Sequence, residues 1–358
     1  MAYTTINKPT DYFNTTLYTG DGTSSNAITG VGFAPDFVWS KARNGANAHV
    51  LIDKVRGATK VLHSSATTAE QTSNANQDTI SLDSDGFTVG TPTQFLGTNT
   101  NGRTVASWNW KANGAGSANT DGSISSTVSA SATSGFSIVS YTGTGSAGTI
   151  GHGLGSTPKM IIFKDRSNVN GWHTYHSSFA NATDLLLLDT TNALYTANNY
   201  INNTRPTSSV FSLGNTAGTN GSSANYIAYC FAEKTGYSKF GSYTGTNSDD
   251  GTFLYLGFKP AFIMVKAASG SNTPGSQNWV ILDNKRSSSG GNNVIQYKLF
   301  PSANDAENTA ENNHADFLSN GVKFRGGNDA TNGNNTYIYM AFAEQPLVGS
   351  NNVPCTAR

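Results

Sequence analysis

The sequence has almost no cysteine and no excess of charge of either sign. Its two cysteines, Cys230 and Cys355, give neither a disulfide framework nor a C-x-x-C metal pair, so its stability must come from packing. The 22 basic and 22 acidic side chains cancel and form no basic stripe, which argues against binding to nucleic-acid phosphates. No polybasic patch that would suit a membrane surface is evident either.

Long apolar runs and helical signals are also scarce. The longest aliphatic run, Leu185 to Leu188, is flanked by aspartates and is far too short to cross a bilayer. Residues 1–10 have neither a basic start nor an apolar stretch, so we expect no secretory signal and no membrane insertion. The best helical signal covers residues 304–318, which suits a short helix or a coiled loop.

Small, polar and aromatic residues are abundant. The 38 glycines, together with many Asn, Ser and Thr residues, resemble a low-complexity composition, but 11% aromatic residues is too many for a disordered chain. A folded chain of 358 residues is long enough for two or three domains, each with its own core.

Self-comparison shows that one pattern occurs three times. Tyr18-Thr19-Gly20, Tyr141-Thr142-Gly143 and Tyr243-Thr244-Gly245 open the copies, and they lie about one small domain apart. Each is followed by a Gly and Pro turn and then by an apolar strand. A lysine lies near the end of each of these strands, and we expect these lysines to face solvent: Lys41, Lys164 and Lys266.

Each copy also closes with a polar turn and an alternating aromatic strand. The turns contain Asn101-Gly102, Asn220-Gly221 and Asn332-Gly333. When the closing strands are aligned, two columns of large side chains emerge, which we predict to be the buried face: Trp108, Tyr229 and Met340 in one, and Trp110, Phe231 and Phe342 in the other.

Two further turns predict β-hairpins. Ser84-Asp85-Gly86 occurs in the first copy and Ser319-Asn320-Gly321 in the third, and both Asp-Gly and Asn-Gly tolerate positive φ. A calcium loop at Asp83 to Gly86 is the alternative. It is weakened because the third copy has Leu318 and Asn320 where carboxylates are needed.

These features predict an all-β protein of three tandem antiparallel β-sandwiches of the jelly-roll, concanavalin-like type. The low charge leaves strand edges without the lysines that usually protect them, so we expect partners to cover them. The predicted divisions are a first sandwich at 1–112, a Gly/Ser/Ala-rich linker or thin strand at 113–132, a second sandwich at 133–235, a third at 236–347 and a polar tail at 348–358.

Three motifs could carry chemistry, and each has a structural alternative. Residues 143–148 match G-x-G-x-x-G, but no helix can follow, so we predict a plain turn. The pair His173 and His176 could hold zinc only through a turn and lacks a third ligand nearby. A glycosidase could use the aspartates of the D-x-x-R pairs at 53–56 and 283–286, but it needs two acids close together and the second copy offers no equivalent pair, so we predict local ion pairs.

No catalytic residue, metal site or cofactor is predicted, and an enzyme is disfavoured because no G-x-S-x-G elbow is present. Uncharged amides and hydroxyls interspersed with aromatic rings suit sugars, and they suit protein contacts equally well. If loops bind glycans, the candidate ligand-binding residues are Trp39, Trp172, Tyr175, His173, Trp279, Tyr195 and also Tyr200.

The order of these motifs resembles a repeat domain of tailed-phage virion proteins, especially those of marine phages. The motifs that carry this resemblance include GFSIVSYTGTG at 135–145, HGLG at 152–155, YIAYCFAEK at 226–234, ADFLSNG at 315–321 and YIYMAFAE at 337–344. The resemblance covers about Tyr12 to Pro346. It implies a concanavalin- or laminin-G-like jelly roll in a fibre or another surface protein of the particle, and no binding residue carries over.

The resulting hypothesis is a virion structural protein, assembled in the host cytoplasm, that acts as a tail-fibre or appendage component and adheres to host surface glycans. One alternative is a capsid or tail decoration without a host ligand, and a third is a glycan depolymerase. The expected partners are other virion proteins and further copies of the chain, since such appendages are commonly trimers.

Overall fold

Strands make up nearly all of the regular structure. The computed structural model describes residues 3–74, 77–92, 97–269, 277–286, 294–309, 314–327, 330–349 and 354. Within these ranges the helical elements are a 3-10 turn, η1 (Pro9–Asp11), and one short helix, α1 (Ala217–Asn220). No helix in this part of the chain is long and apolar enough to cross a membrane. The predicted all-β class with antiparallel sheets is confirmed.

One arrangement of four strands occurs three times. In each, the closing strand of the copy lies between two others: the strand that ends in Tyr-Thr and the strand after the proline turn. The strand that follows the proline-turn strand in sequence then pairs with it at the far edge. We call these the inner sheets. They contain β1 (Phe13–Thr19), β9 (Thr104–Trp110), β3 (Phe37–Ala42) and β4 (Val50–Asp53); β12 (Phe136–Thr142), β19 (Asn225–Phe231), β14 (Met160–Asp165) and β15 (Trp172–His176); and β20 (Ser238–Thr244), β27 (Thr336–Pro346), β22 (Phe258–Ala267) and β23 (Val280–Asp283).

The register of the inner sheets repeats as well as the strand order. Three pairs of facing residues show this: Trp39 and Trp108, Ile162 and Tyr229, and Met264 and Met340. The sequence alignment of the three closing strands is therefore confirmed at the level of single residues.

A second, outer sheet packs against one face of each inner sheet. The outer sheets contain β2 (Asn26–Thr29), β8 (Gly86–Val89) and β7 (Thr79–Asp83); β13 (Gly148–Gly151) and β18 (Val210–Leu213); and β21 (Phe253–Tyr255), β26 (Gly321–Phe324), β25 (Ala315–Leu318) and β24 (Val294–Ile295). We call each inner sheet with its outer sheet a lobe: the first (13–110), the second (117–231) and the third (238–346). Each lobe has an apolar core between its two sheets.

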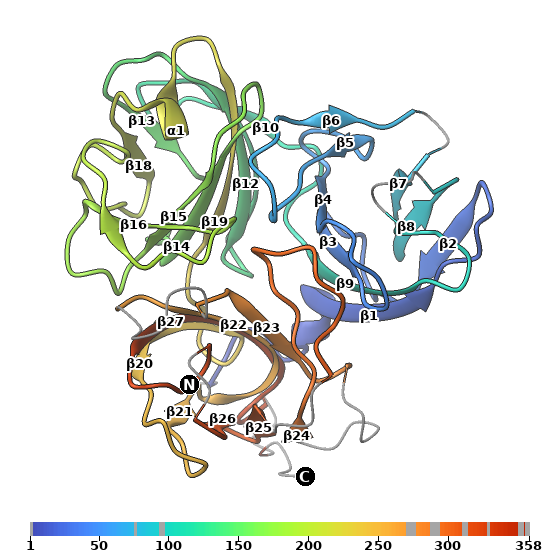
Figure 1. Ribbon diagram of the computed structural model, residues 1–358. Coiled ribbons are helices and arrows are strands. Elements are labelled where there is room, and N and C mark those ends of the chain that lie inside the picture. Colours follow the sequence, from blue (N-terminus) through green and yellow to red (C-terminus); the bar gives the residue numbers. More distant parts are fainter. Residues whose placement is uncertain are drawn as a thin grey trace.

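The opposite faces of the inner sheets meet in the middle of the molecule. Figure 1 shows the three lobes arranged around a common centre. The apolar side chains at this centre come from all three inner sheets, and we call them the central core; they include Phe13, Trp108, Trp110, Ile138, Tyr229, Phe231, Met264, Met340 and Phe342. The Trp110 ring lies 5.7 Å from Phe342 and 6.3 Å from Phe231, centroid to centroid. The two aligned sets of large side chains on the closing strands are therefore buried, as predicted, but they lie in one core that the three lobes share.

The remaining strands extend the second inner sheet or form a two-stranded sheet within the first lobe. They are β10 (Ser117–Asn119), β11 (Ser126–Ser131), β16 (Asp184–Leu187), β17 (Tyr195–Thr196), β5 (Lys60–Val61) and β6 (Gln71–Thr72). Strands β10 and β11 lie within 113–132, so small polar residues form sheet there. The division into domains at 112, 132 and 235 remains a prediction, because the lobes share the central core.

Both predicted hairpins are present, and the predicted helix is not. Asp83 faces Gly86 at the end of the β7–β8 hairpin, and Leu318 faces Gly321 in the β25–β26 hairpin. Residues 304–309 form a loop without helical turns, and 315–318 is strand β25, while 310–313 lie outside the described residues.

The glycine of each Tyr-Thr-Gly motif is required by a close approach of two backbones. A Cβ atom at Gly20, Gly143 or Gly245 would collide with the carbonyl oxygen of Thr100, Gly221 or Gly333, respectively. Because a backbone carbonyl cannot move aside as a flexible side chain can, only glycine fits at this position.

A buried asparagine fixes the loop that follows each motif. The amide nitrogens of Asn99, Asn220 and Asn332 each donate to two backbone carbonyls, and the amide oxygens each accept from a backbone N–H. In the first lobe the equivalent residue is Asn99, two positions before the predicted Asn101-Gly102 turn. We call these three residues the asparagine clamps.

Candidate binding sites

The three tryptophans that were predicted as ligand residues lie inside the molecule. Trp39, Trp172 and Trp279 are 1%, 0% and 1% exposed and belong to the central core. The Trp172 indole donates a hydrogen bond to the His63 carbonyl of the first lobe (2.8 Å), and the Trp279 indole donates to the Leu187 carbonyl of the second (2.8 Å). These three candidates therefore expose no ring to a ligand, because β3 and β15 are largely buried along both faces and Trp279, just before β23, lies in the same central core.

The other predicted ligand residues lie on the second lobe and do not converge. Tyr175 and Tyr200 are buried in that lobe's own core. His173 is partly buried, and burial lowers its pKa. Only Tyr195, at 39%, is substantially exposed, on the edge strand β17. Among the described residues, no group of three or more His, Cys, Asp or Glu side chains could hold a metal ion.

The first D-x-x-R motif forms the predicted ion pair and also joins two lobes. The side chains of Asp53 and Arg56 are fully buried, and Asp53 accepts a hydrogen bond from the Tyr229 hydroxyl of the second lobe (2.8 Å). Glu70 bridges Arg56 (3.1 Å) to Arg166 of the second lobe (2.8 Å), and its N–H donates to the Arg166 carbonyl (2.9 Å). Burial alone would raise the pKa of Glu70, but the two guanidinium groups outweigh it and lower that pKa. We call this the first ionic boundary.

The second D-x-x-R motif repeats this arrangement between the third and first lobes. Asp283 and Arg286 form a fully buried pair, and Asp283 accepts a hydrogen bond from the Trp108 indole (2.9 Å). Glu307 bridges Arg286 (2.8 Å) to Arg43 of the first lobe (2.8 Å), and its N–H donates to the Arg43 carbonyl (2.7 Å). In this second ionic boundary the acids are as inaccessible as in the first, so the D-x-x-R acids do not supply the carboxylate pair that a glycosidase needs.

The boundary between the second and third lobes has the same geometry without the acid–arginine network. The backbone N–H of Leu194 donates to the Ala268 carbonyl (3.2 Å). Leu194 thus takes the place of the bridging glutamate of the other two boundaries, and Ala268 takes the place of the arginine whose carbonyl accepts this bond. By register and spacing, His176 replaces the aspartate, Phe179 the first arginine and Met340 the hydrogen-bond donor. We call this the apolar boundary. The absence of D-x-x-R from the second copy is therefore one part of a coordinated replacement of five side chains.

The three strand-end lysines are buried, contrary to the prediction. Lys41, Lys164 and Lys266 are all 0% exposed. Lys164 donates to the Thr67 carbonyl of the first lobe (3.0 Å), and Lys266 donates to the Thr191 carbonyl of the second lobe (3.1 Å). Burial lowers the pKa of Lys41 and of Lys164 to about 8 and that of Lys266 to about 7. These ammonium groups hold neighbouring backbone segments and are not available to a ligand.

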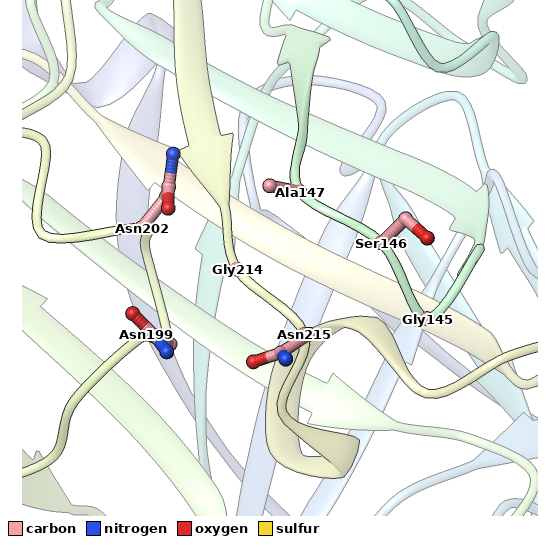
Figure 2. Close-up of a pocket in the computed structure, with 7 residues that line it drawn as sticks. All are labelled: Gly145, Ser146, Ala147, Asn199, Asn202, Gly214 and Asn215. Atoms are coloured by element: carbon pink, nitrogen blue, oxygen red, sulfur yellow. The ribbon is translucent and has the colours of Figure 1, made fainter.

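An amide-lined hollow opens at the end of the second lobe, and we call it the polar hollow. It has a volume of about 270 Å³ and is drawn in Figure 2. Three separate loops contribute to it: Gly145, Ser146 and Ala147 from one, Asn199 and Asn202 from the second, and Gly214 and Asn215 from the third. The three asparagine side chains are exposed, and within the described chain their amides make no hydrogen bond. Their donors and acceptors are therefore free for a ligand.

The backbone around the polar hollow is held in place. The clamp residue Asn220 donates to the carbonyl oxygens of Ser146 (2.7 Å) and Gly214 (2.6 Å). Asn199 and Asn202 adopt positive φ angles of 67° and 50°, which asparagine tolerates better than most residues. The G-x-G-x-x-G stretch borders this site as a turn followed by strand β13, which confirms the predicted turn. The Asn-rich segment at 198–203 was the sequence signal that could have indicated the site.

The fold thus defines an all-β protein whose three lobes share one apolar core and whose loops form an uncharged polar hollow. The chain belongs to a family described as "Domain of unknown function (DUF7483)", whose model matches residues 8–346. The matched range includes all three lobes as one unit. No curated protein sequence gives a significant match.

Proposed function

We propose that the protein is a phage virion component, of a tail fibre or another appendage, that adheres to glycans on the host surface. The observation that carries this proposal is the polar hollow, where exposed amides of Asn199, Asn202 and Asn215 surround one opening without partners in the described chain. Neutral amides and hydroxyls match sugar hydroxyls in both donor and acceptor capacity. The resemblance of the motif order to phage virion repeats supports the virion setting.

The rigidity of the surroundings favours binding. The asparagine clamp, the central core and the buried boundaries fix the loops before a ligand arrives, so little conformational freedom is lost on association. Individual sugar contacts are weak, and such preorganisation increases the fraction of their energy that appears as affinity.

The proposed partners are other virion proteins, further copies of the chain and a host glycan. The alternative is a capsid or tail decoration, which would bind the particle and not the host. Locating the chain on the assembled virus by electron microscopy would separate an appendage from a decoration.

The binding test uses a glycan array and host envelope fractions with the intact protein. Asn202→Gly removes one amide and keeps the positive φ, so we expect binding about fivefold weaker, since one hydrogen bond contributes about 1 kcal/mol. Asn247→Gly is the matched control, because Asn247 is also exposed with a φ of 51° and lies on the third lobe. No loss is expected for the control.

Two results would contradict the proposal. One is failure of the wild-type protein to bind any saccharide or host cell. The other is equal binding by the Asn202→Gly variant and wild type, which would remove the polar hollow as the site. Shorter products after incubation with host polysaccharide would instead support a depolymerase.

A further inference from the structure

Two aromatic side chains are exposed side by side on strand β21 of the third lobe. Phe253 is 44% exposed and Tyr255 is 49% exposed, while Leu254 between them is 8% exposed and packs into the lobe's core. Residues i and i+2 of a strand point to the same face and lie about 7 Å apart. The two rings therefore form one outward-facing surface, which we call the aromatic pair.

The first lobe shows that the fold does not need this pair. Gly321 faces Tyr255, and its counterpart Gly86 faces Thr29, so the positions of Phe253 and Tyr255 are occupied by Ala27 and Thr29 in the first lobe. The central residue stays apolar and buried there, as Ile28.

The second lobe gives the same result. Ile150 is its buried central residue, and Thr149 and Gly151 occupy the flanking positions. Aromatic residues at the flanking positions are thus specific to the third lobe, although all three lobes keep the buried residue between them. The strand arrangement that the lobes share therefore does not require aromatic residues at these positions.

An ammonium group lies beside the pair without a carboxylate partner. Lys239, on the edge strand β20, donates to the Tyr255 carbonyl (2.9 Å), and its Nζ lies 5.1 Å from the centre of the Tyr255 ring. Among the described residues it forms no ion pair, whereas Lys323 pairs with Asp250 (2.7 Å) and Lys259 with a glutamate (2.7 Å). Figure 1 shows β20 and β21 on the same side of the third lobe.

The neighbouring contacts fix this surface and close its edge. Tyr3 packs beside Tyr255 and donates a hydrogen bond to the Gly257 carbonyl (2.7 Å). Strand β21 is an edge strand of only three residues, and Lys239 occupies one of its carbonyls. A short edge capped by lysine is poorly suited to strand addition by a second chain.

The geometry points to the aromatic pair as a binding surface for acidic sugars, in which pyranose rings stack on Phe253 and Tyr255 while a hexuronate carboxylate pairs with Lys239. Aromatic faces suit the apolar C–H faces of pyranoses, and the unpaired ammonium supplies charge complementarity for a carboxylate. This inference rests on the proposed glycan-binding function and names a ligand class for it, at a site separate from the polar hollow.

The test compares oligogalacturonate and alginate oligomers with the methyl ester of oligogalacturonate, which is a matched neutral probe. Wild type should bind at least one acidic oligomer about tenfold more tightly than the ester, and added salt should reduce the difference. Phe253→Ala with Tyr255→Thr installs the first-lobe residues, so it should leave the unfolding midpoint unchanged and weaken binding at least about tenfold. Lys239→Gln should abolish only the preference for acid over ester. Val169→Thr, which alters an isolated side chain that is 74% exposed, should change nothing.

The outcomes separate this inference from the proposed function. If wild type binds no saccharide at all, the proposed function fails. If wild type binds glycans, Asn202→Gly weakens that binding and the double variant does not, only the present inference is overturned. It is also overturned if Lys239→Gln keeps the preference for acid, or if sedimentation velocity shows that the double variant dissociates a dimer, since the pair would then be a self-association surface.

Discussion

The ionic boundaries allow a test of whether the buried charges hold the lobes together. At the first ionic boundary, Glu70→Gln keeps the shape of the side chain and removes the charge between Arg56 and Arg166. Both guanidinium groups would then lack part of their neutralisation in a site where the Arg56 side chain is fully buried. We therefore expect a large loss in the free energy of unfolding.

The size of that loss follows from the burial of the partners. Removing one member of a buried ion pair costs about 3–5 kcal/mol, whereas an exposed pair contributes about 0–1 kcal/mol. The side chains of Glu70 and Arg166 retain 11% and 18% exposure, so we expect about 3 kcal/mol, at the lower end of the buried range.

The apolar boundary provides the companion variant. Transplanting its residues onto the first ionic boundary changes five side chains: Asp53→His, Arg56→Phe, Glu70→Leu, Arg166→Ala and Tyr229→Met. Because well-packed apolar groups can replace a whole buried ion network at little cost, we expect this protein to be more stable than one with Glu70→Leu alone.

The assay is urea unfolding monitored by tryptophan fluorescence and circular dichroism. Lys8→Gln is the control, because the Lys8–Asp11 pair is exposed, with side chains 69% and 45% accessible. The reasoning is refuted if Glu70→Gln costs no more than Lys8→Gln. It is refuted equally if the five-residue transplant is as unstable as Glu70→Leu.

Two further predictions concern Lys266 and Gly245. Burial lowers the pKa of Lys266 from 10.5 to about 7, so between these values the unfolded chain binds a proton that the folded chain lacks. The contribution of Lys266 to the free energy of unfolding should therefore rise from pH 7 to 9.5 by about 1.4 kcal/mol per pH unit, and urea midpoints should rise more steeply with pH in wild type than in Lys266→Met. Equal slopes would contradict this. Gly245→Ala places a methyl group against the Gly333 carbonyl and should destabilise by more than about 2 kcal/mol, whereas Gly155→Ala, in open space at positive φ, should cost about 1 kcal/mol by thermal unfolding. Similar losses in both variants would remove the steric explanation.

Internal repetition made much of the fold predictable. Three aligned examples of each strand revealed the alternation that marks buried positions, and the Asp85-Gly86 and Asn320-Gly321 turns fixed two hairpins. The sequence could show that Trp110 and Phe342 belong to a buried face. It could not show that they meet each other, because an alternating pattern identifies a face and not the surface that covers it.

The same limit explains the errors for lysines and tryptophans. Lys41 lies near the end of an inner strand, where its charge alone predicts solvent, but the side chain is fully buried and its ammonium group donates to the carbonyl oxygens of Ala42 (2.7 Å) and Gly45 (3.1 Å). Trp172 is a candidate ligand-binding residue by sequence, whereas its indole donates a hydrogen bond to the His63 carbonyl of the first lobe. The error for Trp172 follows from a contact between segments about a hundred residues apart, which local patterns do not encode.

The candidate sites depended even more on three-dimensional placement. Asn199 and Asn215 lie on different loops, and only the folded second lobe brings them to one opening. The aromatic pair could in principle have been found from the sequence alone. Alignment places Phe253 with Ala27 of the first copy and Thr149 of the second, so only the third copy has an aromatic residue at this position. That comparison becomes informative only once the register shows that the flanking positions point outward.

Closure of the three lobes within a single polypeptide has a consequence for valency. In a symmetric homotrimer every contact between subunits would be identical, and any surface feature would appear three times on each trimer. Here the three contacts between lobes differ, since two contain buried acid–arginine networks and the third has apolar side chains in their place, and among the described residues the exposed pair of Phe253 and Tyr255 lies on the third lobe alone. The molecule therefore presents that surface once, and avidity for a repetitive cell coat would have to come from displaying many chains.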